Sequence, residues 1–396
     1  MINVAKAQKI ISESTPLAKS EVVSIVDSDG RILAEDLIAT RNQPPFDRVT
    51  MDGIAIDSSS KNTEYTIEGI QAAGQSQLTL SDSSMCFEVM TGASLPIGCD
   101  CVIPYELIQI NTETKKVIIN KEDIVAMNNI HKESSDYKEG DILLEAGLKI
   151  TSPVCAIIAS QGRSKVTVFK NPKVVIISTG SELVDLDQAI LPYQIFMSNS
   201  YAIEAELKNY GLTEIKRLHI PDDERETEIQ IEKALNEYEI IILTGGVSRG
   251  KFDYIPGTLE KLGVSKLFHK IKQKPGKPMW YGTKGTKQVF ALPGNPVSCL
   301  VCLRRYVIPS LDLAFNQVVT PVYGELQKNI KFKSDFTYYV PVKASHTKDG
   351  KLALTPISNN GSGDFYATGL SSGFAELPPD QEIFNTGDKF RYYSWS

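Results

Sequence analysis

Two runs of consecutive apolar residues, each followed by a Thr-Gly loop, constrain the fold of this chain more than any other feature. The first run is KVVIIS at residues 173–178, followed by TGSEL, and the second is EIIIL at residues 239–243, followed by TGG. A strand that is apolar at nearly every position is buried on both faces, which is typical of parallel sheets covered by helices. Helical patterns at about residues 198–210 and 222–237 separate the strands. The alternation predicts a doubly wound, nucleotide-binding-like α/β domain over residues 167–312.

Patterns typical of β-structure flank this domain on both sides. Residues 45–130 contain short runs such as EYTIEGI, CFEVM, CVIPY and KVIIN, which predict a small β domain, and residues 313–396 predict a second, barrel-like one. Residues 1–44 and 131–166 are expected to form a discontinuous N-terminal α+β linker domain. The predicted fold class is therefore multidomain α/β, with a central doubly wound domain, two small β domains and an N-terminal α+β linker region.

Composition narrows the classes of function. The 396 residues carry a formal net charge of -6, which argues against a nucleic-acid-binding protein, because such proteins are basic. No apolar run approaches the ~20 residues that a membrane span requires, and the start MINVAKAQKIISEST lacks the apolar core of a signal peptide. A cytoplasmic protein without membrane contact is expected. The six cysteines lack zinc spacing, and Cys299 and Cys302 are expected to be buried, reduced thiols.

Three loops of the α/β domain occupy the positions at which such folds bind ligands, beyond the carboxyl ends of strands. They are Ser178-Thr179-Gly180-Ser181-Glu182, Thr244-Gly245-Gly246-Val247-Ser248 and Leu292-Pro293-Gly294-Asn295-Pro296-Val297-Ser298. Glycine lets backbone N–H groups approach an anion closely, and small hydroxyl groups add donors. In the third loop Asn295 is a candidate cap and Pro296 the first residue of a helix. Each loop alone is equally compatible with a tight turn or an ordinary capped helix, but three in one domain favour a phosphate or oxyanion site.

A rigid basic segment, KIKQKPGKPMWYG at residues 270–282, lies between the second and third loops. If residues 268–274 are extended, Lys270, Lys272 and Lys274 share one face, because strand side chains alternate. Three like charges on one face repel one another unless water or an anion lies between them. A solvated strand face is the alternative, but the two prolines of the segment favour a fixed geometry and hence a small anionic ligand. Lys277 is expected in the Pro-Gly turn.

Acidic residues in the loops are candidates for a metal site. Asp52 stands in MDG, Asp222-Asp223 in IPDD and Asp253 in GKFDY. Beside a phosphate these carboxylates would be repelled unless they held Mg²⁺, a hard ion that takes carboxylate and phosphate oxygens. Each is also a possible helix cap or turn residue. That interpretation is preferred for Asp223, whereas a functional role is preferred for Asp253.

Six motifs occur in order along the chain: PPFDRVTMDGIAI, MTGASLP, STGSEL, TGGVSRGKFDY, KPGKP and LPGNPVS. Together they resemble the MoeA family of molybdopterin molybdenumtransferases, which is related to the E domain of gephyrin, and the resemblance covers essentially the whole chain. It implies a transferase of molybdenum cofactor biosynthesis that inserts molybdate into adenylylated molybdopterin and releases AMP, with Mg²⁺ as cofactor. It also implies a homodimer whose cleft is shared between subunits, with molybdopterin adenylyltransferase as the upstream partner.

The resemblance assigns roles position by position. The catalytic positions that it implies are Asp52, Glu182, Asp222, Asp253, Lys270 and Lys274, of which Asp222 and Asp253 would hold the metal. The cofactor-binding positions that the loops and the resemblance indicate together are Thr91, Asp136, Thr179, Gly180, Gly245, Gly246, Ser248, Pro293, Gly294, Asn295, Pro296 and Ser298. Asp52 and Thr91 would reach the cleft from the other subunit. Lys272 and Lys277 have no assigned role in the family, and the sequence offers no reason for the lesser role of Lys272.

The chain departs from the family pattern at several positions. Ser134-Ser135 replace a common Gly-acid pair in the connector KESSDYKEGD, which bears most on the role of Asp136. Two alternative functions stay open: a non-catalytic scaffold of the gephyrin E-domain type, and molybdopterin adenylyltransferase. The lysine and aspartate pairs favour an enzyme, because a scaffold would not need both. Molybdate and tungstate have nearly the same size and charge, so the preferred oxyanion stays open.

Overall fold

The computed structural model describes residues 1–247, 254–358 and 360–395. The chain divides into two compact units, the first of residues 1–35, 146–151 and 165–396 and the second of residues 36–145 and 152–164. The residues expected to form one linker domain, 1–44 with 131–166, are thus distributed over both units. None of the helices in the described part of the chain has the length and apolar composition of a membrane span.

A six-stranded sheet in the order β16-β13-β17-β21-β20-β18 forms the centre of the first unit. Its strands are β13 (Val174–Thr179), β16 (Ile215–Ile220), β17 (Ile240–Thr244), β18 (Ser265–His269), β20 (Trp280–Lys284) and β21 (Lys287–Leu292). The first four in spatial order are parallel, and β20 and β18 add an antiparallel edge. The two apolar runs of the sequence are the neighbouring strands β13 and β17, which are buried almost throughout.

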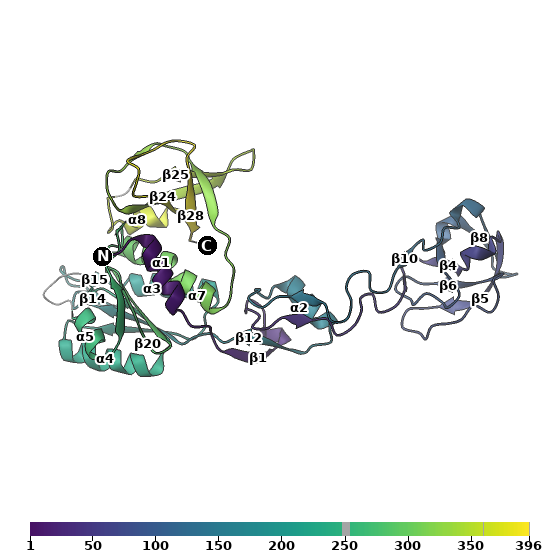
Figure 1. Cartoon of the computed structure of the whole chain (residues 1–396), viewed down its shortest axis with the longest axis horizontal. Coiled ribbons are helices and arrows are strands. Elements are labelled where there is room, and N and C mark those ends of the chain that lie inside the picture. The colour runs from purple at the N-terminus through teal and green to yellow at the C-terminus, as the bar shows by residue number, and fades with distance from the viewer. Residues whose placement is uncertain (248–253, 359, 396) are drawn as a thin grey trace. The chain divides into compact units, whose positions relative to one another are not determined.

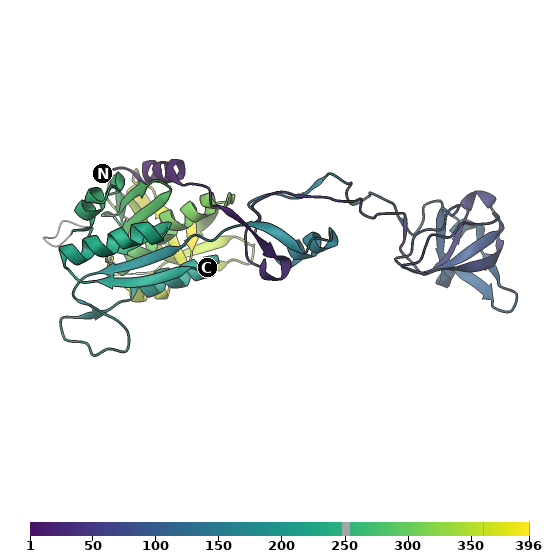
Figure 2. The same cartoon turned by 90° about the horizontal axis from the view of Figure 1, so that it is seen from below.

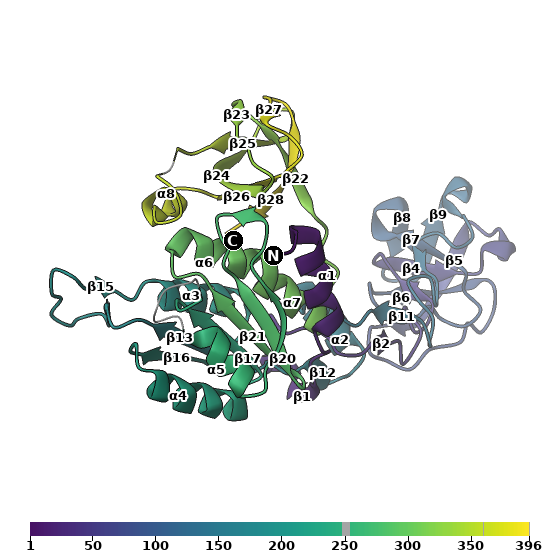
Figure 3. The same ribbon diagram turned by 60° about the vertical axis from the view of Figure 1, so that its left-hand side comes forward.

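Helices cover both faces of this sheet (Figure 3). One face carries α1 (Val4–Ser14), α3 (Asn199–Tyr210), α6 (Pro296–Cys302) and α7 (Ile308–Ala314), and the other carries α4 (Glu224–Glu237) and α5 (Ile255–Lys261). Along β17, Ile240 and Ile242 pack into the first core, whereas Ile241 and Leu243 pack into the second. Side chains of a strand alternate between its faces, so this strand must be apolar throughout. The predicted doubly wound domain is confirmed.

The two cysteines of α6 are buried, as predicted from their apolar surroundings. Cys299 and Cys302 have no exposed surface. Burial raises the pKa of the Cys299 thiol to about 12, so this thiol stays protonated at neutral pH. The Sγ of Cys302 lies 3.4 Å from Nε2 of Gln273. Both thiols belong to the core, and Cys302 packs beneath the lysine segment.

The C-terminal β domain of the first unit is a small closed barrel. Its strands are β22 (Val322–Leu326), β24 (Thr337–His346), β25 (Leu352–Pro356), β26 (Gly373–Leu377) and β28 (Lys389–Ser394), with β23 (Ile330–Lys331), β27 (Ile383–Phe384) and α8 (Phe365–Gly369) beside them. The order β24-β25-β22-β28-β26 closes because β26 also pairs with β24. Figure 1 shows these strands next to α1 and α7. Val297 and Val301 of α6 share a core with Tyr339 and Phe374 of the barrel.

The second unit contains a curved six-stranded sheet in the order β7-β4-β6-β5-β9-β8 (Figure 2). Its strands are β4 (Gly53–Ile56), β5 (Glu64–Gln71), β6 (Met85–Val89), β7 (Cys101–Pro104), β8 (Ile108–Asn111) and β9 (Lys116–Ile119). Short antiparallel ladders join β2 (Leu37–Ile38) to β11 (Ile142–Leu144) and β3 (Arg48–Val49) to β10 (Ile130–His131), and α2 spans Ser152–Ser160. In the first unit β1 (Ser20–Ser24) pairs with β12 (Lys165–Phe169).

Candidate functional site

The three loops predicted from the sequence meet at one cavity of about 450 Å³, beyond the carboxyl ends of β13, β17 and β21. The predicted positions that line it are Thr179, Glu182, Gly245, Gly246, Pro293, Gly294, Asn295 and Pro296. The parallel order of these strands explains the convergence, because parallel strands end at the same edge of a sheet. The cavity therefore lies at the position where the sequence predicts a ligand-binding site.

Close backbone packing holds the loops against one another. Thr179 donates from Oγ1 to the carbonyl oxygen of Thr244 at 3.2 Å, and the N–H of Gly245 donates to the carbonyl of Leu292 at 3.2 Å. Gly245 has a φ of 91°, and a Cβ at this position would lie 2.8 Å from the carbonyl oxygen of Thr179. Only glycine avoids that clash. The second loop thus fits tightly between the other two.

Two helices begin at the rim of the cavity. α3 begins after Ser198 and α6 after Asn295, and α6 continues through a π-helical turn into α7. Asn199 donates from Nδ2 to the carbonyl oxygen of Gly294 at 2.7 Å, which ties the start of α3 to the third loop. The free N–H groups and the positive dipole end of a helix N-terminus favour anions. This side of the cavity is therefore suited to phosphate groups.

The third loop differs in detail from the prediction. Asn295 occupies the cap position of α6, but its side chain makes no capping bond and instead donates from Nδ2 to Oγ of Ser362 at 2.8 Å. The prediction of a side-chain cap is wrong, because the amide is used to bind the C-terminal domain. Pro296 begins the helix, as predicted. Ser298 is buried and is not one of the described residues that line the cavity.

The first loop is held from outside the cavity by an aspartate. The N–H of Ser181 donates to Oδ2 of Asp222 at 3.1 Å, and the N–H of Asp222 donates to Oγ of Ser181 at 2.9 Å. Glu182 is exposed, and its carboxylate lies so close to Gly180 that a Cβ there would collide with it. Asp223 caps α4 by accepting from the N–H of Glu226 at 2.7 Å, which confirms the interpretation as a cap.

The metal site stays a prediction. Ser248 and Asp253 lie outside the described residues. Within the described ranges, no three His, Cys, Asp or Glu side chains gather as potential metal ligands. Asp222 is thus the predicted metal ligand whose surroundings the structure describes.

The lysine segment does not form the continuous strand that the sequence suggested. β18 ends at His269, Lys270 has a positive φ of 72°, and β19 (Gln273–Lys274) pairs with β24 of the barrel. The backbone turns because its hydrogen-bond partners belong to two different sheets. The prediction that Lys270, Lys272 and Lys274 share one face of a regular strand is therefore wrong.

The structure separates these lysines by their neighbours. Lys272 donates from Nζ to Oδ2 of Asp335 at 2.8 Å. No described carboxylate lies within salt-bridge distance of Lys270 or Lys274. The charge of Lys272 is thus paired with that of a carboxylate, whereas the charges of Lys270 and Lys274 are not paired in this way among the described residues.

Lys274 and Lys277 lie beside aromatic rings of the C-terminal domain. The ammonium of Lys274 is 5.7 Å from the ring centre of Phe332, and that of Lys277 is 5.4 Å from the ring centre of Phe336. Lys277 stands in the turn after Pro275, as predicted. Cation–π contacts of this length hold an ammonium in place without neutralising its charge. Both lysines therefore keep their charge available to an anion.

The remaining predicted positions belong to the second unit. Asp52 accepts from the N–H of Thr91 at 2.6 Å and from its Oγ1 at 2.8 Å, and these bonds lower the pKa of the Asp52 carboxyl. His131 lies 3.0 Å from Nη2 of Arg48 through Nδ1 and 2.9 Å from Oδ1 of Asp136 through Nε2. Because arginine only donates, Nδ1 accepts and Nε2 donates to Asp136. The meeting of these residues with the cavity stays a prediction.

The sequence reasoning missed part of the lining. Three lining residues, Ser178, Thr244 and Val247, belong to the predicted loops but had no role of their own. The described lining residues outside the three loops are Leu183, Ile195, Phe196, Met197, Ser198, Asn199 and Pro278. Ser198-Asn199 directly before a helical pattern is N-cap chemistry, and this signal could have placed the start of α3 at the site. The apolar members carry no local sequence signal of this kind.

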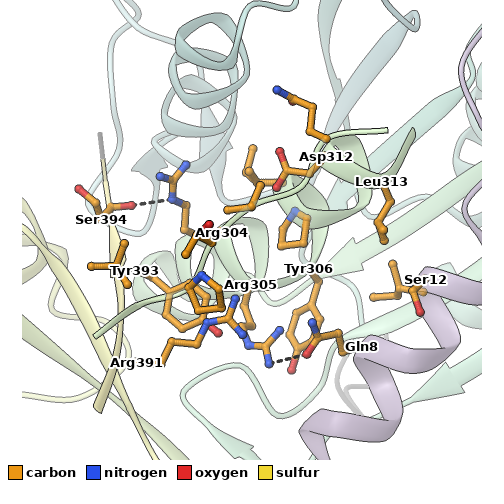
Figure 4. Close-up of a pocket in the computed structure, with 18 of the residues that line it drawn as sticks. Gln8, Ser12, Arg304, Arg305, Tyr306, Asp312, Leu313, Arg391, Tyr393 and Ser394 are labelled. Atoms are coloured by element: carbon orange, nitrogen blue, oxygen red, sulfur yellow. Dashed lines mark hydrogen bonds between the residues drawn. The ribbon is translucent and has the colours of Figure 1, made fainter. Parts of the chain in front are cut away.

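A larger cavity of about 760 Å³ lies beside α1, α7 and β28 (Figure 4). Arg304 pairs with Glu206 and Arg305 pairs with Glu376 through Nε at 3.1 Å, whereas Arg391 lies 4.8 Å from the ring centre of Tyr393. None of the three predicted loops contributes to it among the described residues. The smaller cavity, where glycine loops and helix N-termini converge, is therefore the candidate site.

Family models match nearly the whole chain. The model "MoeA N-terminal region (domain I and II)" matches residues 2–162, "Probable molybdopterin binding domain" matches residues 175–313, and "MoeA C-terminal region (domain IV)" matches residues 323–395. The central match contains all three loops of the candidate site.

Curated relatives and solved structures agree with these models. A molybdopterin molybdenumtransferase of Synechocystis sp. is 40% identical, with 100% of both chains covered. That of Bacillus subtilis is 30% identical over 98% of this chain and 92% of its own length. A crystal structure of the molybdopterin biosynthesis MoeA protein from Pyrococcus horikoshii OT3 superposes with a TM-score of 0.84 at 25% identity and 100% coverage of both chains. The multidomain α/β fold predicted from the sequence is confirmed, and the chain belongs to the MoeA family of molybdopterin molybdenumtransferases.

Proposed function

We propose that this protein inserts molybdate into adenylylated molybdopterin and releases AMP. Its relatives are molybdopterin molybdenumtransferases, transferases of molybdenum cofactor biosynthesis. The observation that carries the proposal is the convergence of three loops and two helix N-termini at one cavity of the domain that matches the molybdopterin-binding model. Such a cavity suits a ligand with a diphosphate, which is the linkage that forms when AMP is joined to the phosphate of molybdopterin.

The loops of the cavity would hold the diphosphate. The backbone N–H of Gly246 and the first turn of α3 would supply donors, and the hydroxyl of Thr179 and the positive end of α6 lie beside them. Donors that the fold holds in place stabilise charge as it develops on an oxygen, without a cost of reorientation. They also fix the phosphate groups relative to the incoming oxyanion.

Lys270 and Lys274 would hold molybdate. Both substrates are anions, so their mutual repulsion is a main part of the barrier. Lys270 is half-buried at a bend of the backbone, and Lys274 lies on the strand that joins the barrel. Positive charges in fixed positions lower the repulsion between oxyanion and phosphate.

Asp222 has the properties of one Mg²⁺ ligand. Its Oδ2 accepts from the N–H of Ser181, whereas Oδ1 accepts no hydrogen bond from the described residues. Mg²⁺ is usually held by one or two carboxylates together with substrate phosphates, and Asp253 is the second predicted carboxylate. When bound, Mg²⁺ would polarise the diphosphate bond that is broken. Glu182 is exposed in the first loop, next to Ser181, and would face the solvent side of the phosphates.

We further infer that the enzyme acts as a homodimer in which the partner subunit supplies Asp52 and Thr91 to the cleft. The supporting observation is that Thr91 holds the Asp52 carboxylate in one orientation on an exposed surface. A carboxylate fixed in this way is ready for a contact that its own subunit does not provide. Molybdopterin adenylyltransferase would supply the substrate.

Product analysis tests the function. The purified protein is incubated with adenylylated molybdopterin, molybdate and Mg²⁺, and AMP and molybdenum bound to the pterin are measured. Release of AMP together with molybdenum insertion supports the proposal. Formation of pyrophosphate from ATP and molybdopterin would assign an adenylyltransferase, and binding without any turnover would assign a scaffold.

A further inference from the structure

The candidate cavity has an apolar side that the phosphate-binding loops do not explain. Leu183, Ile195, Phe196 and Met197 form it, from the paired strands β14 (Leu183–Val184) and β15 (Ile195–Phe196). Met197 is buried, but 43% of Phe196 is exposed. An apolar ring that stands half-exposed beside a polar cavity gains free energy when a ligand covers it. The cavity thus offers one polar and one apolar surface to the same ligand.

Hydrogen bonds fix the apolar side next to the phosphate side. The N–H of Met197 donates to the carbonyl of Val184 at 2.9 Å, which holds the backbone on one side of Phe196. Three residues after Phe196, Asn199 begins α3 and donates to the carbonyl of Gly294 at 2.7 Å. The aromatic ring is therefore attached by a short, bonded segment to a helix start that suits phosphate.

We propose that Phe196 is a specificity-determining residue that stacks on a flat heteroaromatic ring of the substrate while the diphosphate lies against the loops. This inference rests on the proposed function, because adenylylated molybdopterin carries such a ring at each end, adenine and pterin, with the diphosphate between them. Stacking on an aromatic side chain accepts either ring, since each has a π-face. The shared chemistry is thus a planar nitrogen heterocycle next to phosphate.

The same segment provides a matched control. Tyr193 lies three residues before Phe196 and is 74% exposed, and it is not among the described residues that line the cavity. Figure 3 shows that the loop carrying β15 extends away from the central sheet. Truncation of Tyr193 removes an aromatic ring from the same loop without changing the cavity wall.

Calorimetric titration of four proteins tests the proposal: wild type, Phe196→Ala, Phe196→Trp and Tyr193→Ala. Each is titrated with AMP, adenylylated molybdopterin and inorganic pyrophosphate, after circular dichroism has confirmed the native fold. Phe196→Ala is expected to weaken binding of a ring-bearing ligand by about tenfold, with pyrophosphate affinity unchanged. Phe196→Trp and Tyr193→Ala are expected to bind as wild type does.

The ligand series identifies the ring and the way the proposal fails. Weakened AMP binding assigns adenine to Phe196, whereas weakened binding of adenylylated molybdopterin alone assigns the pterin. Unchanged affinity for both ring-bearing ligands, or an equal loss for pyrophosphate, overturns the proposal. If the wild type binds and discriminates in this way but releases no AMP, the stacking role stands and the proposed transfer reaction fails.

Discussion

Single residues acquire their roles from what the fold places beside them, and the lysine segment shows this most clearly. Four lysines of one short stretch have different surroundings, since Lys272 pairs with Asp335 whereas Lys274 lies beside the ring of Phe332. A charge that is already paired contributes little to anion binding, because the ligand would have to displace the carboxylate. The two side chains therefore form a matched pair with which the proposed anion site can be tested.

Lys274→Ala and its matched control Lys272→Ala turn this difference into a prediction. We expect the first variant to insert molybdenum at least about tenfold more slowly, because a fixed positive charge near the reacting oxyanion is lost. The second should stay within about twofold of wild type, since it removes a lysine whose charge is paired. Rates of AMP release at saturating substrate check both. Equal rates in the two variants would remove Lys274 from the anion site.

Thr91→Val tests the environment of Asp52. The variant loses the hydroxyl bond at 2.8 Å but keeps the bond from the Thr91 N–H. Both bonds favour the charged carboxylate, so the loss of one should raise the pKa of Asp52 towards its ordinary value of about 3.9. A depressed folded-state pKa stabilises the fold above the unfolded-state pKa, and this contribution disappears as pH falls through the folded-state pKa. The variant should therefore lose less stability on acidification than wild type does.

Carboxyl carbon chemical shifts followed by NMR titration measure this pKa. Thr63→Val, at an exposed position of the same unit, is the control and should leave the Asp52 titration in place. An unchanged Asp52 pKa in Thr91→Val would mean that the hydroxyl bond has no influence on the carboxylate. In that case its orientation for a partner subunit would need another cause.

At the scale of elements, the sequence predicted those that follow from a local pattern and failed where partners are distant. The apolar run at Ile240–Leu243 must be a strand buried on both faces, because each side chain has its own core to enter. In contrast, no local signal in residues 268–274 shows that β18 belongs to the central sheet and β19 to the barrel. The regular strand expected there was wrong because long-range pairing outweighs local alternation.

The candidate site divides in the same way. Glycine loops such as that at Gly245 were predictable, because tight turns at strand ends require particular residue types. The side-chain bond of Asn295 was not, since its partner Ser362 lies in another domain. Phe196 was missed because an exposed aromatic residue in a loop has no distinctive local pattern. The glycine loops of the site can thus be predicted from the sequence, whereas its apolar wall can be identified only in the folded structure.

Arg305 joins three elements and yields a prediction at this scale. It is 3% exposed, pairs through Nε with Glu376 of β26 at 3.1 Å, and donates from Nη2 to Oε1 of Gln8 on α1 at 3.0 Å. Arg305→Met leaves Glu376 with a poorly solvated, unpaired charge, so we expect the free energy of unfolding to fall by about 3–5 kcal/mol. Arg391→Met, a half-exposed arginine of β28, should cost less than about 1 kcal/mol.

Urea unfolding followed by tryptophan fluorescence measures these changes, since Trp280 and Trp395 both lie in the first unit. The double variant Arg305→Met/Glu376→Leu separates the pair from its packing. Removal of both charges should recover most of the loss, because the unpaired carboxylate no longer exists. If the double variant is as unstable as Arg305→Met, the arginine acts through packing alone.

At the scale of the whole molecule, the predicted site residues are distributed over both units. Asp52 and Thr91 belong to the second unit, whereas Lys270 and Lys274 belong to the first. A closed homodimer has two equivalent sites, and each can combine surfaces of both subunits. Our proposal that the partner supplies Asp52 thus makes a statement about subunits that single variants cannot test, because every site of a homodimeric variant carries the same change.

A mixed dimer of Asp52→Asn and Lys274→Ala subunits, isolated with two different affinity tags, resolves this. If Asp52 and Lys274 of one site come from different subunits, one site of the mixed dimer carries both changes and the other carries neither. Activity should then return to roughly half of the wild-type value per dimer, although each parent dimer is nearly inactive. If both residues of a site come from one subunit, each site of the mixed dimer carries one change and no activity returns.

A mixed dimer of Lys270→Ala and Lys274→Ala subunits is the control, because both lysines lie in one unit of the chain and every site then has one defect. Recovery in that control would mean that Lys270 and Lys274 of one site come from different subunits, whereas recovery only in the first pair would place Asp52 in the partner's cleft.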